Sequence, residues 1–114
     1  MNAQLQVWLD ALQTAALDKL KELRTEFAAP AAKDAAQFIA DSATDLARWG
    51  AMYSEGQLSR AEVESLVKGL GEGAQMHGLT QLGLAQIEFD KIKRQVLDTV
   101  AGVIGGSLKS LLPM

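Results

Sequence analysis

His77 is the only histidine in the sequence, and there is no cysteine, so few side chains are suited to acid–base, nucleophilic or metal chemistry. Zinc proteases need two histidines one helical turn apart, and di-iron helical proteins need Glu-x-x-His pairs. The residue three positions before His77 is Ala74. Serines and aspartates are present, but no nucleophile elbow supports a Ser-His-Asp triad. We therefore expect His77 to be a structural histidine.

A glycine-rich stretch places Gly69, Gly71 and Ala74 at the G-x-G-x-x-A spacing of phosphate-binding loops. A dinucleotide-binding loop of this kind follows a β-strand, whereas the residues before Gly69 have the pattern of a capped helix. Close helix packing is the better explanation for these glycines.

Two carboxylates, Asp41 and Asp45, lie one helical turn apart with Arg48 nearby. We interpret this group as a solvated helix face, because two carboxylates alone form a weak metal site. The absence of cysteine also excludes disulfide frameworks, thiolate nucleophiles and cysteine-based metal sites. The sequence thus predicts no catalytic residue, metal or cofactor, and a protein that is not an enzyme.

Composition points to a single all-α domain spanning residues 1–114. The chain is 48% hydrophobic and 22% charged, with a net charge of -3, which does not suggest nucleic-acid binding. Helix-favouring residues are abundant, and alternation typical of strands is nearly absent. Neither a secretory signal nor an apolar run of membrane-spanning length is visible, so we expect a cytoplasmic protein.

The first half of the chain predicts two helices, at about residues 3–27 and 31–53. Leucines and other apolar residues recur every three or four positions along the first helix. Pro30 lacks an amide donor and disfavours helix at Ala29, so we expect the chain to bend or break there.

The main turn is expected at residues 54–59. Gly56 suits the left-handed conformation that ends a helix. Ser59, followed three residues later by Glu62, forms a capping-box signature ahead of an apolar run.

The second half leaves two architectures open, because five glycines fall between Gly69 and Gly83. We favour a continuous helix over about residues 60–105, since apolar residues keep helical spacing through this region. The fold is then a long antiparallel helical hairpin with a proline bend. A break near Gly71–Gly73 would instead give a four-helix bundle.

A 4-3 apolar repeat runs through the last predicted helix and is typical of coiled-coil and other helix–helix contacts. An isolated hairpin would leave apolar faces exposed, so we expect copies of the chain, or a helical protein partner, to cover them. Two tryptophans would serve as aromatic anchors. The predicted protein interface comprises Trp8, Trp49, Leu82, Phe89, Ile92, Val96 and Val103.

The C-terminal segment, residues 91–114, differs in charge from the rest of the chain. It carries four basic residues and one acidic residue, a net +3, so the remainder carries -6. Such a basic amphipathic segment can lie on an anionic membrane, although docking on protein is the alternative that we favour. The candidate membrane contacts are Val100, Ile104, Leu108, Lys109, Leu111 and Leu112.

The stretch from Leu46 to Lys93 resembles small uncharacterised all-helical bacterial proteins. The residues that carry the resemblance are Leu66-Val67-Lys68-Gly69, Met76-His77-Gly78-Leu79 and Gly83-Leu84-Ala85. The resemblance implies a bacterial source and a helical fold, with no activity attached. Our leading hypothesis is a non-enzymatic, self-assembling or partner-binding helical protein with a structural, scaffolding or adaptor role. The alternative is a membrane-active protein that acts through its C-terminal helix.

Overall fold

A computed structural model describes residues 3–23 and 25–108. Over these residues the chain forms six α-helices and no strand, so the predicted all-α fold class is confirmed. The helices are α1 (Ala3–Leu20), α2 (Thr25–Asp41), α3 (Ala43–Ser54), α4 (Arg60–Glu72), α5 (His77–Thr80) and α6 (Gln86–Ser107).

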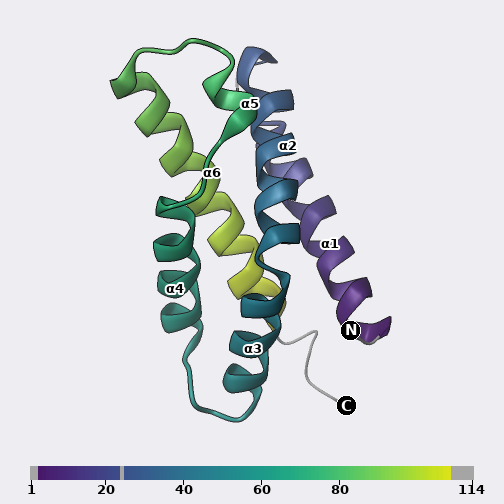
Figure 1. The fold of residues 1–114 in the computed structure, drawn as a ribbon. Helices are drawn as coiled ribbons and strands as arrows, with labels where there is room; N and C mark the ends of the chain where they lie inside the picture. Colours follow the sequence, from purple (N-terminus) through teal and green to yellow (C-terminus); the bar gives the residue numbers. More distant parts are fainter. Residues whose placement is uncertain (1–2, 24, 109–114) are drawn as a thin grey trace.

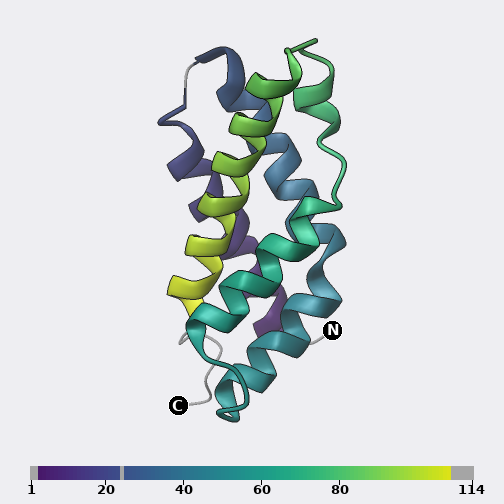
Figure 2. The same cartoon turned by 90° about the vertical axis from the view of Figure 1, so that its left-hand side faces the viewer.

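Helix α6 is the central element of the fold. It packs against α4 and α1, while α2 contacts α1, α5 and α6. Figure 1 shows α2 and α3 following one another, with α4 running back beside α3. In the perpendicular view of Figure 2, α4 and α6 lie side by side over much of their length. The result is an elongated molecule with extents of 45 × 23 × 22 Å.

The hydrophobic core runs between these helices and draws on all six of them. Burying a large aliphatic side chain contributes about 1.5–3 kcal/mol, so the core is the main source of stability. The largest fully buried side chains are Leu12, Leu20, Ile39, Leu46, Val63, Val67, Met76, Leu79, Val96, Val100, Ile104 and Leu108.

The predicted break at Pro30 is wrong. Helix α1 ends at Leu20, well before residue 27, and Pro30 lies inside α2. A proline inside a helix costs about 3 kcal/mol, chiefly through one lost backbone hydrogen bond and steric conflict with the preceding turn. The next turns of α2 bury Ala31, Ala35 and Ile39 almost completely. We attribute the continuity of α2 to this packing. The preference of proline for breaking a helix is local and takes no account of such packing.

The helix predicted over residues 31–53 is instead divided into α2 and α3 at Ser42. Neither glycine nor proline marks this point. The Ser42 amide donates to the Phe38 carbonyl at 3.0 Å, and the Leu46 amide donates to the Ser42 carbonyl at 2.9 Å. Backbone hydrogen bonds therefore continue across the junction, which explains why the sequence pattern did not reveal it.

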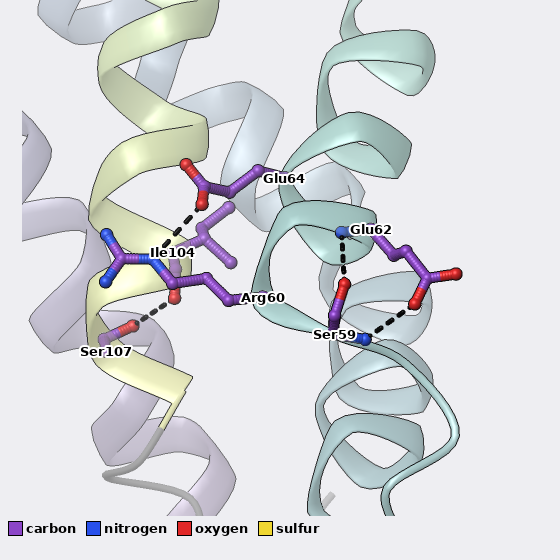
Figure 3. Close-up of polar contacts among 6 residues, drawn as sticks. All are labelled: Ser59, Arg60, Glu62, Glu64, Ile104 and Ser107. Carbon is purple, nitrogen blue, oxygen red and sulfur yellow. Dashed lines mark hydrogen bonds and ion pairs between the residues drawn. The ribbon is translucent and has the colours of Figure 1, made fainter.

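The turn between α3 and α4 has the structure that the sequence predicts. Gly56 adopts a φ of 78°, and Ser59 forms a complete capping box with Glu62 (Figure 3). The Glu62 amide donates to Ser59 Oγ at 3.1 Å, and the Ser59 amide donates to Glu62 Oε1 at 2.9 Å. This exchange satisfies two amides that a helix N-terminus leaves without intrahelical partners.

The continuous helix predicted over residues 60–105, which the long hairpin requires, is wrong. Helix α4 ends at Glu72, and α6 begins only at Gln86. The short helix α5 lies between them, and Gly83 adopts a φ of 67° before α6 starts. The break allows Met76 and Leu79 to turn into the core, where both are fully buried. Their burial provides a physical reason why the glycine-rich region does not remain straight.

Candidate functional site

The residues of the predicted interface on α6 lie inside the chain's own core. Ile92, Val96 and Val103 are buried, and α6 packs on α4 and α1. The 4-3 repeat therefore marks a helix–helix contact within one chain. In this conformation a second chain has no access to these three side chains.

Both predicted aromatic anchors are also buried. The indole Nε1 of Trp8 donates to the carbonyl oxygen and to Oγ of Ser107, at 3.2 and 3.1 Å. This contact ties the start of α1 to the end of α6. Trp49 is buried on α3. The two tryptophans thus anchor the fold of the chain itself.

Two residues of the predicted interface remain nearer the surface. Leu82 lies in the turn after α5, with 38% of its surface exposed, and Phe89 is partly buried. Ile87, in the first turn of α6, is 85% exposed, and Leu84 is partly buried against the core. We refer to Leu82, Leu84, Ile87 and Phe89 as the 82–89 corner. Ile87 was not among the predicted interface residues, because it lies off the 4-3 repeat.

Three candidate membrane contacts, Val100, Ile104 and Leu108, are buried in the core. The other three, Lys109, Leu111 and Leu112, lie outside the described residues. Among the residues placed by the structure, no helix combines the length and hydropathy needed to cross a bilayer.

His77 is exposed at the start of α5. Beside it, the backbone amides of Gly78 and Leu79 donate to the two carboxylate oxygens of Asp34, at 2.8 and 2.9 Å. Asp34 belongs to α2 and is 6% exposed. Asp34 was not among the residues predicted from the sequence. It shares a helix face with Ala31 and Ala35, and a carboxylate on such a core-facing stripe needs buried hydrogen-bond donors, which is the signal that could have identified it.

The G-x-G-x-x-A stretch contributes to helix packing. A Cβ atom on Gly71 would overlap the side chain of Leu97 on α6, whereas a Cβ on Gly69 would meet no atom within 4 Å. Gly71 therefore permits the close approach of α4 and α6. At the end of α4, Lys93 Nζ donates to the carbonyl oxygens of Glu72 and Ala74, at 3.0 and 2.9 Å.

A surface groove of about 640 Å³ lies between two walls of the helical fold. One wall comes from α2 and α3, and the other from the end of α4, the following connection and α5. Its lining residues are Gln37, Phe38, Asp41, Ser42, Asp45, Leu70, Gly73, Ala74, Gln75 and His77. Among its described lining residues there are two carboxylates and neither a lysine nor an arginine.

Asp41, Ser42 and Asp45 form the polar part of this groove. Asp45 Oδ1 pairs with Arg48 at 3.0 Å, while Asp41 Oδ1 accepts a hydrogen bond from the Gln37 side chain at 2.8 Å. Ser42 is 5% exposed, and its side chain does not cap α3. Within the described chain, Asp41 has no ion-pair partner, and no buried side-chain nitrogen or oxygen lacks a hydrogen-bond partner.

The described residues contain no group of three or more histidine and acidic side chains arranged to hold a metal ion. The helix junction brings Ser42 into the groove, and the turn after α4 brings His77 there. Neither position could be inferred from sequence spacing, because the two lie on different walls.

Comparison of the chain with protein-family models, curated proteins and solved structures finds no match.

Proposed function

We propose that this protein is a non-enzymatic helical interaction protein, which assembles with copies of itself or binds a protein partner through the 82–89 corner. The observation that carries the proposal is the exposure of Ile87, 85%, in a stretch of eight residues that also holds the exposed Leu82 and the partly buried Leu84 and Phe89. Single exposed apolar residues are common on monomeric proteins, whereas a cluster is typical of contact surfaces. Covering such a side chain contributes about 1.5–3 kcal/mol.

The non-enzymatic part of the proposal is supported by the surroundings of His77. Its side chain is exposed, and no hydroxyl, carboxylate or amide of the described residues forms a hydrogen bond with its ring. A general base is normally positioned by such a partner and placed next to a nucleophile.

The membrane-active alternative has less support. Val100, Ile104 and Leu108 would have to leave the core before they could contact lipid. Burial of three large apolar side chains stabilises the fold by several kcal/mol, so their release is costly.

Sedimentation velocity across a micromolar concentration series tests self-assembly. We expect the wild-type protein to associate with increasing concentration and Ile87→Asp to remain a monomer. The new carboxylate falls in the first turn of α6, where the helix dipole favours negative charge, so folding should be retained. Val7→Asp is the matched control, because Val7 is also an exposed aliphatic residue, 67%, on α1.

A wild-type monomer at several hundred micromolar would contradict self-assembly. Equal effects of Ile87→Asp and Val7→Asp would contradict the assignment of the contact to the corner. Cross-linking of a partner to the wild-type chain, with loss in Ile87→Asp alone, would support the partner-binding form of the proposal.

A further inference from the structure

The connection between α4 and α6, residues 73–85, is held in its turn by a small set of groups. Within this stretch only Met76 and Leu79 are buried. The carboxylate of Asp34 on α2 accepts hydrogen bonds from two backbone amides of α5. Gly83 adopts a φ of 67°, a left-handed conformation that residues with a side chain rarely adopt. The turn therefore depends on few contacts, and one of its residues is in a conformation that a helix would release.

Helices α4 and α6 pack antiparallel, and side-chain contacts fix their register. Figure 2 shows the two helices side by side. The contacting pairs are Glu64 with Gly105, Lys68 with Asp98, and Gly71 with Leu97. Successive residues of α4 thus meet residues progressively nearer the start of α6, and the register points toward the connection.

The contact face of α4 continues through the connection into that of α6. Residues spaced by three or four positions extend it, namely Ala74, Gly78, Leu82, Ala85 and Phe89. None of these five is buried in the compact chain. In two straight antiparallel helices of the same register, Leu82 lies opposite Ala85 and Phe89 lies opposite Gly78. Each large side chain then faces a small residue, which suits close helix packing.

We propose that two copies of the chain form a dimer by exchanging α6. Residues 60–107 are helical in each protomer of this dimer, and the α6 of one protomer packs against α1, α2 and α4 of its partner. The packing that covers α6 in the compact chain is re-formed between protomers. The two connections add the contacts of Leu82 with Ala85 and of Phe89 with Gly78. The turn is thus the state of the connection in the monomer, and the helix is its state in the dimer.

The monomer and the dimer are favoured by different interactions. Straightening the connection exposes Met76 and Leu79 and removes the hydrogen bonds to Asp34, so these groups favour the monomer. The new contacts between the connections and the release of Gly83 favour the dimer, and so does a high protein concentration. The dimer should therefore form only at high concentration.

Exchange is a second mode of self-association, distinct from the contact proposed at the 82–89 corner. Because α6 lies at the centre of the fold, it must leave the core before it can exchange, so exchange in the folded protein is slow. Refolding at high concentration is the direct route to the dimer. Ile87 lies two positions from Phe89, on roughly the opposite side of the helix, and the exchange does not depend on it.

The test is refolding of the full-length protein from urea, at about ten and at several hundred micromolar, followed by size-exclusion chromatography at low concentration. We expect a dimer only after refolding at the higher concentration. The dimer should persist on dilution, because its return to monomer again requires α6 to leave the core. The contact at the corner involves no such step and should dissociate rapidly.

Cross-linking identifies the helices that are exchanged. Equal amounts of ¹⁴N- and ¹⁵N-labelled chains are refolded together and treated with a carbodiimide, which joins an ammonium to an adjacent carboxylate as an amide. Lys68 Nζ and Asp98 Oδ1 lie 3.3 Å apart. Mass spectrometry of the dimer should find this cross-link with both isotopes, because α4 of one protomer lies beside α6 of its partner. The pair of Lys21 and Asp18, 3.5 Å apart and near in sequence, is the control and should carry one isotope.

Two glycine substitutions test the role of the connection. Gly83→Ala strains the monomer but not a helix, and its Cβ meets no atom within 4 Å. The concentration at which half of the chain refolds as dimer should fall at least about tenfold. Gly56→Ala is the matched control, because Gly56 has a φ of 78° and equally open surroundings. Its turn between α3 and α4 is present in both forms, so this concentration should not change.

A proline substitution should have the opposite effect. Ala85 has a φ of -61° in the monomer, which is the conformation that proline adopts. Ala85→Pro therefore suits the turn but interrupts a helix that continues through the connection. The concentration needed for the dimer should rise at least about a hundredfold.

The results separate exchange from other forms of association. Mixed-isotope cross-links between Lys68 and Asp98, with opposite effects of Gly83→Ala and Ala85→Pro, support it. Single-isotope cross-links in the dimer, equal effects of the two glycine substitutions, or an unchanged dimer in Ala85→Pro overturn it. Refolding to monomer alone at several hundred micromolar also overturns it. Ile87→Asp should still exchange, so the rapid association of that variant reports on the corner separately.

Discussion

The carboxylate of Asp34 accepts a 2.8 Å hydrogen bond from the backbone amide of Gly78, 44 positions further along the chain. Its second oxygen accepts from the next amide, that of Leu79. Asp34 thus does for the start of α5 what an N-cap side chain does, but from a neighbouring helix. A Cβ on Gly78 would lie 3.0 Å from both Asp34 Oδ1 and the Pro30 carbonyl oxygen, so glycine permits this close approach. The pair fixes α5 against α2.

Asp34→Ala should lower the free energy of unfolding by about 2–4 kcal/mol. The substitution leaves two amides without their acceptor, and each hydrogen bond to a charged group contributes about 1.5–3 kcal/mol before relaxation. Urea denaturation measures the change, with the exposed Asp18→Ala as the control. Asp34→Asn, which retains one acceptor oxygen, should fall between alanine and the wild type. A loss below about 0.5 kcal/mol in Asp34→Ala would show that the contact does not stabilise the fold.

Alanine at Gly71 and at Gly69 should change stability in opposite directions. Gly71→Ala places a methyl group against the buried Leu97 side chain and should cost about 1–3 kcal/mol through overpacking. Gly69→Ala meets open space on the same helix and should stabilise by about 0.5–1 kcal/mol through helix propensity. Thermal and urea unfolding of both variants test this pair. Stabilisation by both substitutions would contradict the close approach of α4 and α6.

Ser59→Ala should destabilise the protein by about 1 kcal/mol, because the capping box loses the acceptor for the Glu62 amide. Ser65→Ala on the exposed surface of α4 is the control. It should be neutral or slightly stabilising, since alanine is the better helix former. Amide hydrogen exchange in the first turn of α4 should increase in Ser59→Ala alone. Equal exchange in the two variants would argue against the cap.

Trp8→Phe should lower the free energy of unfolding by about 1–2 kcal/mol. It removes the indole donor to Ser107 but retains most of the buried aromatic surface. Trp49→Phe is the matched control, since Trp49 is buried to a similar extent and no described residue accepts from its indole nitrogen. The decrease in the free energy of unfolding should therefore be smaller for Trp49→Phe than for Trp8→Phe. A larger loss in Trp49→Phe, measured by urea denaturation, would contradict a role for the contact between α1 and α6.

Local signals in the sequence predicted local structure well. Ser59 and Glu62 specify the start of α4 through hydrogen bonds between near neighbours. Gly56 adopts the left-handed conformation expected after the end of a helix. The 4-3 repeat through Ile92 and Val96 identified a buried helix face. It could not identify the covering helices, because burial by α1 and α4 leaves the same pattern as burial by another chain.

The errors occur where packing between distant segments opposes a local preference. Pro30 locally favours a break, but the buried residues that follow it keep α2 intact. Ser42 carries no signal of a break, and its place in the groove depends on the junction of α2 and α3. The glycines after Gly69 permit either a straight helix or a turn, and only the burial of Met76 and Leu79 discriminates between them.

By itself, the sequence determined the all-α class, the turn at residues 54–59 and the apolar faces, because each follows from helix periodicity or from hydrogen bonds between near neighbours. The tertiary structure decided which faces cover one another, where the glycine-rich region turns, and which polar groups meet. The Asp34 contact with Gly78 and the groove around Ser42 both join segments more than 25 residues apart. Such contacts depend on the packing of the whole chain, which no short sequence window contains.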